Sequence, residues 1–319
     1  MLYPAPYVSR SCIFKPGGKG ENYRFHLQFA EYNLFIGKTA QPTNTPNVYL
    51  SIASQTLWLH GISTAIAWIT EDLKAIGNGT IQRIKPSRVD LCADFYISGG
   101  LDHDFLLSHK VTHNETEKFY RGNNRLETFY VGDAQSPTQL RIYNKGLEVK
   151  KINTKLWFLG LWGKESLDDI WRFEFQLRRG ILKQLGVETL EDLERLQAGI
   201  WSHLTSKWFS LRIPDNEKAE RRTIHSLWLA VQECAQSFGQ VIEIKRVTAP
   251  AATASPEWYL SHIDGCLSSF AALLGITNRE ETLAALKSYL DKHKTPDQFE
   301  EATLKKSIQR GTLAEGGKQ

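Results

Sequence analysis

The stretch WRFEFQLRRG, residues 171–180, has the most regular alternation of apolar and polar side chains in the sequence. A period of two predicts a β-strand with one buried face. The buried face of this strand would carry four large apolar side chains, those of Trp171, Phe173, Phe175 and Leu177. The opposite face would present Glu174 between Arg172 and Gln176. The sequence therefore predicts a sheet with one face on a core and the other strongly polar.

A second strand with a polar face is predicted by RVDLCADF, residues 88–95. Asp90 and Asp94 lie four residues apart and share a side with Cys92, while the positions between them are apolar. If this strand joins the same sheet as residues 171–180, three carboxylates gather on one surface. Such a cluster of hard oxygen ligands is what Mg²⁺ or Mn²⁺ prefers.

The third polar face lies in TQLRIYNKGLE, residues 138–148, where Tyr143 stands between Arg141 and Lys145. A phenol beside cations and carboxylates suits phosphodiester chemistry, because a metal polarises the phosphoryl oxygens, cations offset developing charge and the phenolate attacks. We expect the flanking cations and a bound metal to lower the pKa of this phenol from about 10. Taken alone, each strand is also typical of a solvated face, and Tyr143 of a cross-strand packing residue.

The rest of the sequence is strand-rich before Gly180 and helix-rich after it. NYRFHLQF alternates, NVYLSIAS and TLWLHG are β-rich, residues 62–76 have helical spacing, and RLETFYVG with TQLRIYNK predicts a hairpin. The later part contains four amphipathic helical stretches, with the Pro/Ala/Ser-rich residues 248–256 as a linker between the second and third.

We therefore expect an α+β fold, in which an antiparallel sheet with one polar face is followed by a helical C-terminal region. The sheet domain is expected over residues 1–180 and the helical region over residues 181–305. A disordered tail is expected over residues 306–319, which are rich in glycine and polar side chains.

Composition narrows the class of protein. A hydrophobic content of 41% and a charged content of 23% are those of a globular chain, and the net charge of +4 permits a polyanionic partner. Four cysteines form no CxxC pair, which indicates a reducing compartment rather than a disulfide framework or a structural zinc site. Neither a signal peptide nor an apolar run long enough for a bilayer is present. We expect a soluble, cytoplasmic protein without a membrane partner.

Three segments, in order and at fitting separations, resemble the Rep_trans family of rolling-circle replication initiators, found in plasmids and phages and related to certain conjugative relaxases. SRVDLCADF resembles the family's early strand with its acidic pair, FYVGDAQSPTQLRIYNKGLE its tyrosine-bearing hairpin, and WRFEFQLRR its R-x-E strand. The resemblance covers about residues 45–180, and RIYNK is its more specific element. It does not extend to the C-terminal helices.

The resemblance implies an enzyme that nicks one DNA strand at an origin and rejoins it during rolling-circle replication. Tyr143 would be the nucleophile and keep the 5′ end as a phosphotyrosine, while the freed 3′ hydroxyl primes synthesis. Arg141 and Lys145 would hold the scissile phosphate, with Glu148 orienting Lys145. Because the ester retains the bond energy, rejoining would need no ATP.

The same resemblance implies which residues hold the cofactor and the DNA. The candidate ligands for Mg²⁺ or Mn²⁺ are Asp90, Asp94 and Glu174. The residues that would follow the DNA backbone are Arg172, Arg178 and Lys150. Residues 141–179 contain nine Lys or Arg and five Asp or Glu, a net of +4 (9 − 5), so this segment carries the basicity expected of a phosphate-binding surface.

One motif fits a different class of initiator. HLQ, which contains His26 and Gln28, resembles the His-hydrophobic-Gln metal motif of the HUH endonucleases. That class carries its tyrosine in a helix, usually as YxxK, and YNKG does not supply this pattern. His26 and Gln28 are therefore either metal ligands or outward side chains of a strand that contacts DNA or water.

The implied partners are origin DNA, single-stranded or as a hairpin, and a host helicase and polymerase. The helical region would serve origin recognition or dimerisation, so a homodimer is left open. Three other functions also stay open: a conjugative relaxase with the same chemistry, a DNA-binding module without catalysis, and a purely structural protein.

Overall fold

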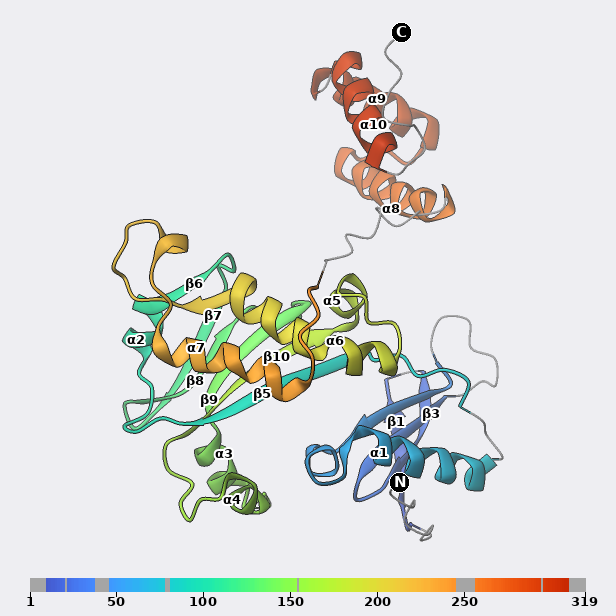
Figure 1. The fold of residues 1–319 in the computed structure, drawn as a ribbon. Coiled ribbons are helices and arrows are strands. Elements are labelled where there is room, and N and C mark those ends of the chain that lie inside the picture. The colour runs from blue at the N-terminus through green and yellow to red at the C-terminus, as the bar shows by residue number, and fades with distance from the viewer. Residues whose placement is uncertain are drawn as a thin grey trace. The chain divides into compact units, whose positions relative to one another are not determined.

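The computed structural model describes most of the chain (Figure 1). The described ranges are 10–20, 22–37, 46–77, 81–153, 155–244, 256–293 and 295–309. The chain divides into two compact units, Met1–Ile84 and Lys85–Gln319. The sequence predicted a boundary at residue 180, but the first helices after that residue share a core with the strands before it.

The first unit is a four-stranded antiparallel sheet with a helical segment that is kinked at Gly61. The strands follow one another in the order β1 (Ile13–Lys19), β2 (Tyr23–Gln28), β3 (Tyr32–Gly37) and β4 (Val48–Ile52). Helix α1 (Ser54–Gly77) packs its Ile66 and Ile69 against Leu34 and neighbouring apolar residues of the sheet. The segment TLWLHG, expected to be β-rich, is helical instead: it forms the first part of α1, which begins two residues after β4 and kinks at Gly61.

The second unit contains a five-stranded antiparallel sheet in the order β5-β10-β9-β8-β7. Its strands are β5 (Arg88–Tyr96), β7 (Glu117–Gly122), β8 (Arg125–Val131), β9 (Thr138–Asn144) and β10 (Ile170–Arg178). The segments expected to be strands with polar faces are β5, β9 and β10, and β10 lies between the other two. The predicted α+β fold with an antiparallel sheet is confirmed.

Helices cover the apolar face of this sheet. They are α5 (Arg179–Gln184), α6 (Leu190–His203) and α7 (Ser226–Glu233). Phe175 of β10 meets Trp201 of α6 edge to face at 5.5 Å, and Phe173 meets Trp228 of α7 at 5.8 Å. Both tryptophans are fully buried, so the alternating apolar residues of β10 form the centre of the core.

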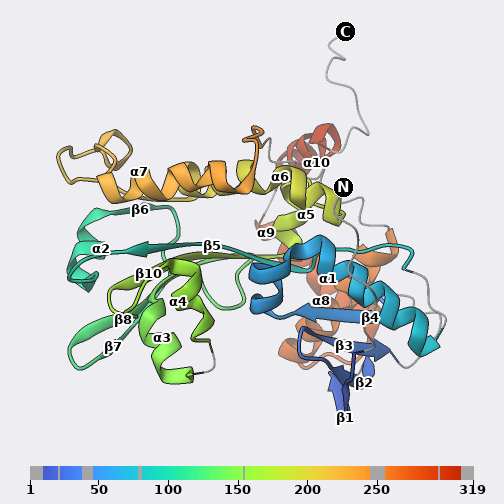
Figure 2. The same ribbon diagram turned by 60° about the horizontal axis from the view of Figure 1, so that its bottom comes forward.

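Shorter elements complete the second unit. They are α2 (His103–His109), β6 (Lys110–Thr112), the π-helical turn η1 (Leu204–Trp208), β11 (Phe209–Leu211), and the 3₁₀ turns η2 (Ala219–Arg221) and η3 (Cys234–Phe238). Strands β6 and β11 pair as a separate antiparallel ribbon. Helices α3 (Lys145–Ile152) and α4 (Trp157–Trp162) lie on the side of the sheet opposite α6 and α7 (Figure 2).

Three further helices follow, α8 (Pro256–Leu274), α9 (Arg279–His293) and α10 (Pro296–Gln309). Phe270 of α8 meets Tyr289 of α9 edge to face at 5.4 Å. The expected disordered tail begins too early, because residues 306–309 belong to α10, and the rest of it lies outside the described residues, as do residues 248–255 of the expected linker. Within the described ranges, no helix is long and apolar enough to span a membrane.

Candidate active site on the polar face of the five-stranded sheet

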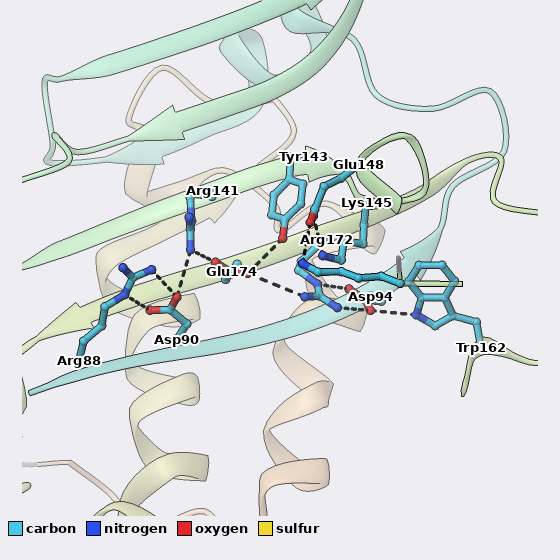
Figure 3. Close-up of polar contacts among 11 residues, drawn as sticks. Arg88, Asp90, Asp94, Arg141, Tyr143, Lys145, Glu148, Trp162, Arg172 and Glu174 are labelled. Carbon is cyan, nitrogen blue, oxygen red and sulfur yellow. Dashed lines mark hydrogen bonds and ion pairs between the residues drawn. The ribbon is translucent and has the colours of Figure 1, made fainter. Parts of the chain in front are cut away.

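The register of β10 brings the three polar strands together. Arg172 lies opposite Asp94 of β5 on one side and Tyr143 of β9 on the other. Glu174, two residues further along, lies opposite Arg141. Because side chains two residues apart share a face, all five side chains emerge on the side away from α6 and α7 (Figure 3).

Tyr143 is the phenol at the centre of this face. Its hydroxyl donates a hydrogen bond to Oε2 of Glu174, at 3.2 Å. Burial raises the pKa of Tyr143, and the nearby guanidinium groups of Arg172 and Arg141 only oppose that rise. The guanidinium groups thus act in the expected direction, but burial outweighs them, so the pKa is raised where the sequence predicted a net lowering. A phenol in this environment is protonated at neutral pH and needs a base to become a nucleophile.

Glu174 is the carboxylate on which the face converges. It is 7% exposed, and Arg141 donates to its Oε1 through Nη2. Nη1 of Arg172 lies 3.9 Å from its Oε2, the same oxygen that accepts from Tyr143. Glu174 is thus held between two guanidinium groups and a phenol, in position to receive the proton of Tyr143.

Asp90 lies at the more exposed end of the same face. Arg88 donates to both of its oxygens, from Nε at 2.8 Å and from Nη2 at 2.6 Å. Nη2 of Arg141 donates to Oδ2 at 3.1 Å as well as to Glu174. The guanidinium of Arg141 therefore bridges Asp90 and Glu174. Its side chain is 24% exposed, so it is the cation next to Tyr143 that solvent can reach.

Asp94 forms a buried ion pair with Arg172. Nε and Nη2 of Arg172 donate to its two oxygens at 2.6 and 2.7 Å, and the indole of Trp162 in α4 donates to Oδ2 at 2.9 Å. Arg172 is 4% exposed and its guanidinium lies 5.1 Å from the ring centre of Phe158. Arg172 was expected to follow the DNA backbone, but in the structure it neutralises Asp94 beneath α4.

Lys145 occupies the first position of α3 rather than the strand assigned to it from the sequence. Its side chain is 3% exposed, and its ammonium bonds Oε2 of Glu148 at 2.5 Å, so the expected pairing of these two residues is present. The ammonium also lies 5.6 Å from the ring centre of Tyr143. Burial and the charge of Arg172 lower the pKa of Lys145, while the bond to Glu148 opposes that effect.

The sequence after Tyr143 explains this abrupt change from strand to helix. Asn144 caps α3 by accepting a hydrogen bond from the backbone N–H of Leu147 at 2.8 Å. At Gly146, a Cβ atom would lie 1.6 Å from the carbonyl oxygen of Leu167, so only glycine allows the backbone to pass there. The YNKG segment therefore ends β9 directly after the tyrosine and turns Lys145 beneath it.

The three acidic residues do not fit a divalent cation in this arrangement. Each of the six oxygens of Asp90, Asp94 and Glu174 accepts from an arginine, a tryptophan or Tyr143. Guanidinium groups thus occupy the sides on which a metal would bind. No group of three or more His, Cys, Asp or Glu placed to hold a metal ion occurs among the residues that the structure describes.

The other residues predicted to bind DNA lie apart from Tyr143. Lys150 is on α3 and pairs with Asp168 at 2.5 Å. Arg178, at the end of β10, donates to the carbonyl of Ala134 at 2.5 Å. The sequence analysis missed Arg88, although its position two residues before Asp90 on a strand indicates that both side chains share a face.

His26 belongs to the first unit, on β2. Its Nε2 is hydrogen-bonded to Oδ1 of Asn33 at 2.8 Å, and its ring stacks on Phe35 with centroids 4.3 Å apart. No carboxylate, cysteine or second histidine completes a metal site around it among the described residues. Gln28 lies two residues further along the same strand.

Comparisons with known proteins give weak likenesses among solved structures. No family model matches the chain, and no curated protein matches it by sequence. A rolling circle replication initiator protein from Geobacillus stearothermophilus is similar in structure, with a TM-score of 0.45 and 14% identical residues over 74% of this chain and 84% of that chain. This similarity is too low to carry a functional conclusion.

Proposed function

We propose that this protein is a DNA nicking and joining enzyme, that Tyr143 is its nucleophile, and that it initiates rolling-circle replication. The observation that supports this most directly is the hydrogen bond from the Tyr143 hydroxyl to Glu174, on a sheet face where Arg141 is open to solvent. A nucleophile needs a base within hydrogen-bond reach, and a phosphodiester needs a cation beside it. All three groups lie side by side here (Figure 3).

The proposed reaction exchanges one phosphoester bond for another. The Tyr143 oxygen attacks the scissile phosphorus, and its proton passes to Oε2 of Glu174. A bond forms between the phenolic oxygen and phosphorus, and the bond between phosphorus and the 3′ oxygen of the preceding nucleotide breaks. The departing 3′ oxygen takes up a proton, which Glu174 can return. The cut strand then has two new ends at the nick: a 5′ phosphate esterified to Tyr143 and a free 3′ hydroxyl.

The surrounding charges support this role for Glu174. The raised pKa of Tyr143 keeps the phenol protonated until a base removes the proton during attack. Arg141 already contacts Glu174, so it can bind a non-bridging phosphate oxygen close to the attacking phenol. Lys145 is buried behind the tyrosine ring and adds positive potential without reaching solvent.

The biological setting follows from this chemistry. Because the phosphotyrosine ester conserves the energy of the original bond, attack by a 3′ hydroxyl reverses the reaction and rejoins the strand. A nicked origin with a free 3′ end serves replication in the cytoplasm, with a host helicase and polymerase as further partners. A conjugative relaxase would use the same steps, and genomic neighbours would distinguish the two.

A second function is favoured by one observation. Asp90, Asp94 and Glu174 on this face are each paired with an arginine. A sheet face whose charges neutralise one another can also serve as a rigid scaffold without catalysis. The chain would then be a non-catalytic DNA-binding module, in which Tyr143 packs between strands.

The test is covalent capture of DNA by Tyr143. The wild-type protein is incubated with supercoiled DNA of its own replicon and with single strands carrying the origin, followed by denaturing electrophoresis and peptide mapping. We expect a protein–DNA adduct on Tyr143 that is absent from Tyr143→Phe. That variant should still fold and bind DNA, because it loses one hydroxyl worth about 1 kcal/mol.

Tyr96→Phe is the matched control, because Tyr96 lies on β5 of the same sheet and is 57% exposed. It should form the adduct normally. If the wild-type protein binds DNA but forms no adduct, the non-catalytic module is supported, and an adduct on another tyrosine would exclude Tyr143. Parallel reactions in EDTA and in added Mg²⁺ or Mn²⁺ measure whether cleavage needs a divalent cation.

A further inference from the structure

A cavity of about 410 Å³ opens on the polar face next to Tyr143. Its lining combines cations, tyrosines and amides, among them Arg88, Arg178, Tyr120, Tyr130 and Gln176. No aspartate or glutamate lines it among the residues that the structure describes. The volume falls in the range of roughly 300–1,000 Å³ for small-ligand sites. The lining therefore indicates an anionic ligand with an aromatic part.

Gln176 is the strongest sign that this cavity takes a ligand. It lies on β10, two residues from Glu174, and is 4% exposed. Its carboxamide makes no hydrogen bond with the residues that the structure describes. Its amide atoms are not among the buried polar atoms that lack a partner, so they are accessible from the cavity that Gln176 lines. A ligand with hydrogen-bonding groups on its edge could bond to this amide in place of water.

The cations of the lining have unused capacity. Arg178 donates to the carbonyl of Ala134, but within the described ranges it has no carboxylate partner. Buried Nε atoms of both Arg178 and Arg141 lack a hydrogen-bond partner. Arg88 and Arg141 already share Asp90, which lies beside the cavity. Arg178 is therefore the group with a free charge for a phosphate.

Two tyrosines provide the aromatic wall. Tyr120 and Tyr130 meet edge to face, with ring centres 5.9 Å apart and planes at 82°. Tyr120 is 60% exposed, so one face of its ring is open to a ligand. Bases stack on such rings without regard to sequence, because every base has a π face.

We propose that this cavity binds one nucleotide of single-stranded DNA beside the scissile phosphate, with its base against Tyr120, the edge of the base on Gln176 and its phosphate on Arg178. This inference rests on the proposed function for the identity of the strand. Arg141 joins the two sites, since it lines the cavity, lies opposite Tyr130 and contacts Glu174. It stands two residues before Tyr143, roughly 7 Å along the strand. The nucleotide in the cavity is therefore adjacent to the one that is cut.

The test measures binding rather than cleavage. A short fluorescein-labelled single strand is titrated with the full chain, and its release is followed on adding a deoxynucleoside 5′-monophosphate, inorganic phosphate or duplex DNA. We expect the nucleotide to compete and inorganic phosphate to compete far less. Tyr120→Ala should weaken single-strand affinity by about 5- to 140-fold, the range for loss of one stacked base.

Two further variants make the test specific. Gln176→Glu places a negative charge in the cavity. The arginines of the lining can neutralise this charge, so the variant should still fold. The variant should weaken both single-strand binding and nucleotide competition. Tyr96→Ala removes an equally exposed tyrosine outside the cavity lining and should leave affinity within about twofold. If Tyr120→Ala behaves like Tyr96→Ala, or if inorganic phosphate competes as well as the nucleotide, the cavity is not a nucleotide site.

The binding result is independent of the nicking result. Tyr143→Phe should retain nucleotide competition at the wild-type level, because Tyr143 does not line the cavity. If the wild-type protein forms no adduct but the nucleotide still competes with the labelled strand, the proposed chemistry is excluded and the nucleotide site is kept. An adduct on Tyr143 with no effect of Tyr120→Ala or Gln176→Glu would keep the chemistry and overturn the nucleotide site.

Discussion

The protein contains two antiparallel sheets that differ in the face turned away from their helices. On the four-stranded sheet of the first unit this face is aromatic. His26 stacks on Phe35 and is hydrogen-bonded to Asn33, and Nζ of Lys19 lies 3.4 Å from the ring centre of Tyr49. On the five-stranded sheet it is ionic, with three arginines and three carboxylates interlocked around one phenol.

The difference shows what each kind of face can do. Stacked rings interact without charge, so the loss of one such contact leaves no buried charge unpaired. Charges removed from water must each meet a partner of opposite sign, so an ionic face fixes its members in one arrangement. Fixed geometry is what a nucleophile and its base require, and we therefore assign the chemistry to the five-stranded sheet.

The largest effect should come from removing the proton acceptor of that face. Glu174→Gln keeps the shape and can still accept a hydrogen bond from Tyr143, but it cannot take the proton. We expect the single-turnover rate of adduct formation to fall by about 10²- to 10⁴-fold, the usual contribution of a general base. Asp168→Asn, which removes an exposed carboxylate of the same unit, should react normally. A wild-type rate in Glu174→Gln would remove this residue from the mechanism.

The buried ion pair offers a direct comparison of stability between the two sheets. Asp94→Ala removes both short hydrogen bonds of Arg172 and leaves its buried charge with only the 3.9 Å contact to Glu174, so we expect the free energy of unfolding to drop by about 3–5 kcal/mol. Asn33→Ala, which removes the neutral partner of His26, should cost only about 1 kcal/mol. Urea titration measures both. Equal losses would show that the ionic face is no more tightly held than the aromatic one, and Asp94→Ala combined with Arg172→Met should recover part of the larger loss.

A smaller effect is expected at high pH. Burial raises the pKa of Tyr143 above its ordinary value of 10.0. Below pH 10 the phenol is protonated in both folded and unfolded chains, but above it the unfolded chain ionises first, so stability falls as pH rises. The slope from this group is at most about 1.4 kcal/mol per pH unit. The free energy of unfolding of Tyr143→Phe should therefore fall less steeply than that of wild type between about pH 10 and 12.

The smallest effect should come from the aromatic face. His26→Ala removes a stacking contact and one neutral hydrogen bond, so it should cost about 1 kcal/mol of stability and leave the rate of adduct formation unchanged. Adduct formation measured with and without added Mn²⁺ checks this. A loss of cleavage that Mn²⁺ restores would instead assign a metal-binding role to His26, as its HLQ motif suggests.

Much of the second unit could be predicted from its sequence. The alternation in β10 identified both its core face and its polar face, and Phe175 and Glu174 lie on the faces expected. The hairpin that carries Tyr143 was also predictable, because turn residues separate two alternating runs. The helices after Gly180 were expected as well, but their place in the same core as the sheet was not.

The site was predictable in its members but not in their pairings. The periodicity of single strands is local, so the sequence by itself determined that Asp90, Asp94, Arg141, Tyr143, Arg172 and Glu174 belong to polar faces. Which charge meets which depends on the register of β10 with β5 and β9 and on the burial imposed by α3 and α4, and these involve residues up to 78 positions apart. Only the tertiary structure could therefore decide that Asp94 binds Arg172 rather than standing free, and that burial outweighs the neighbouring cations and raises the pKa of Tyr143.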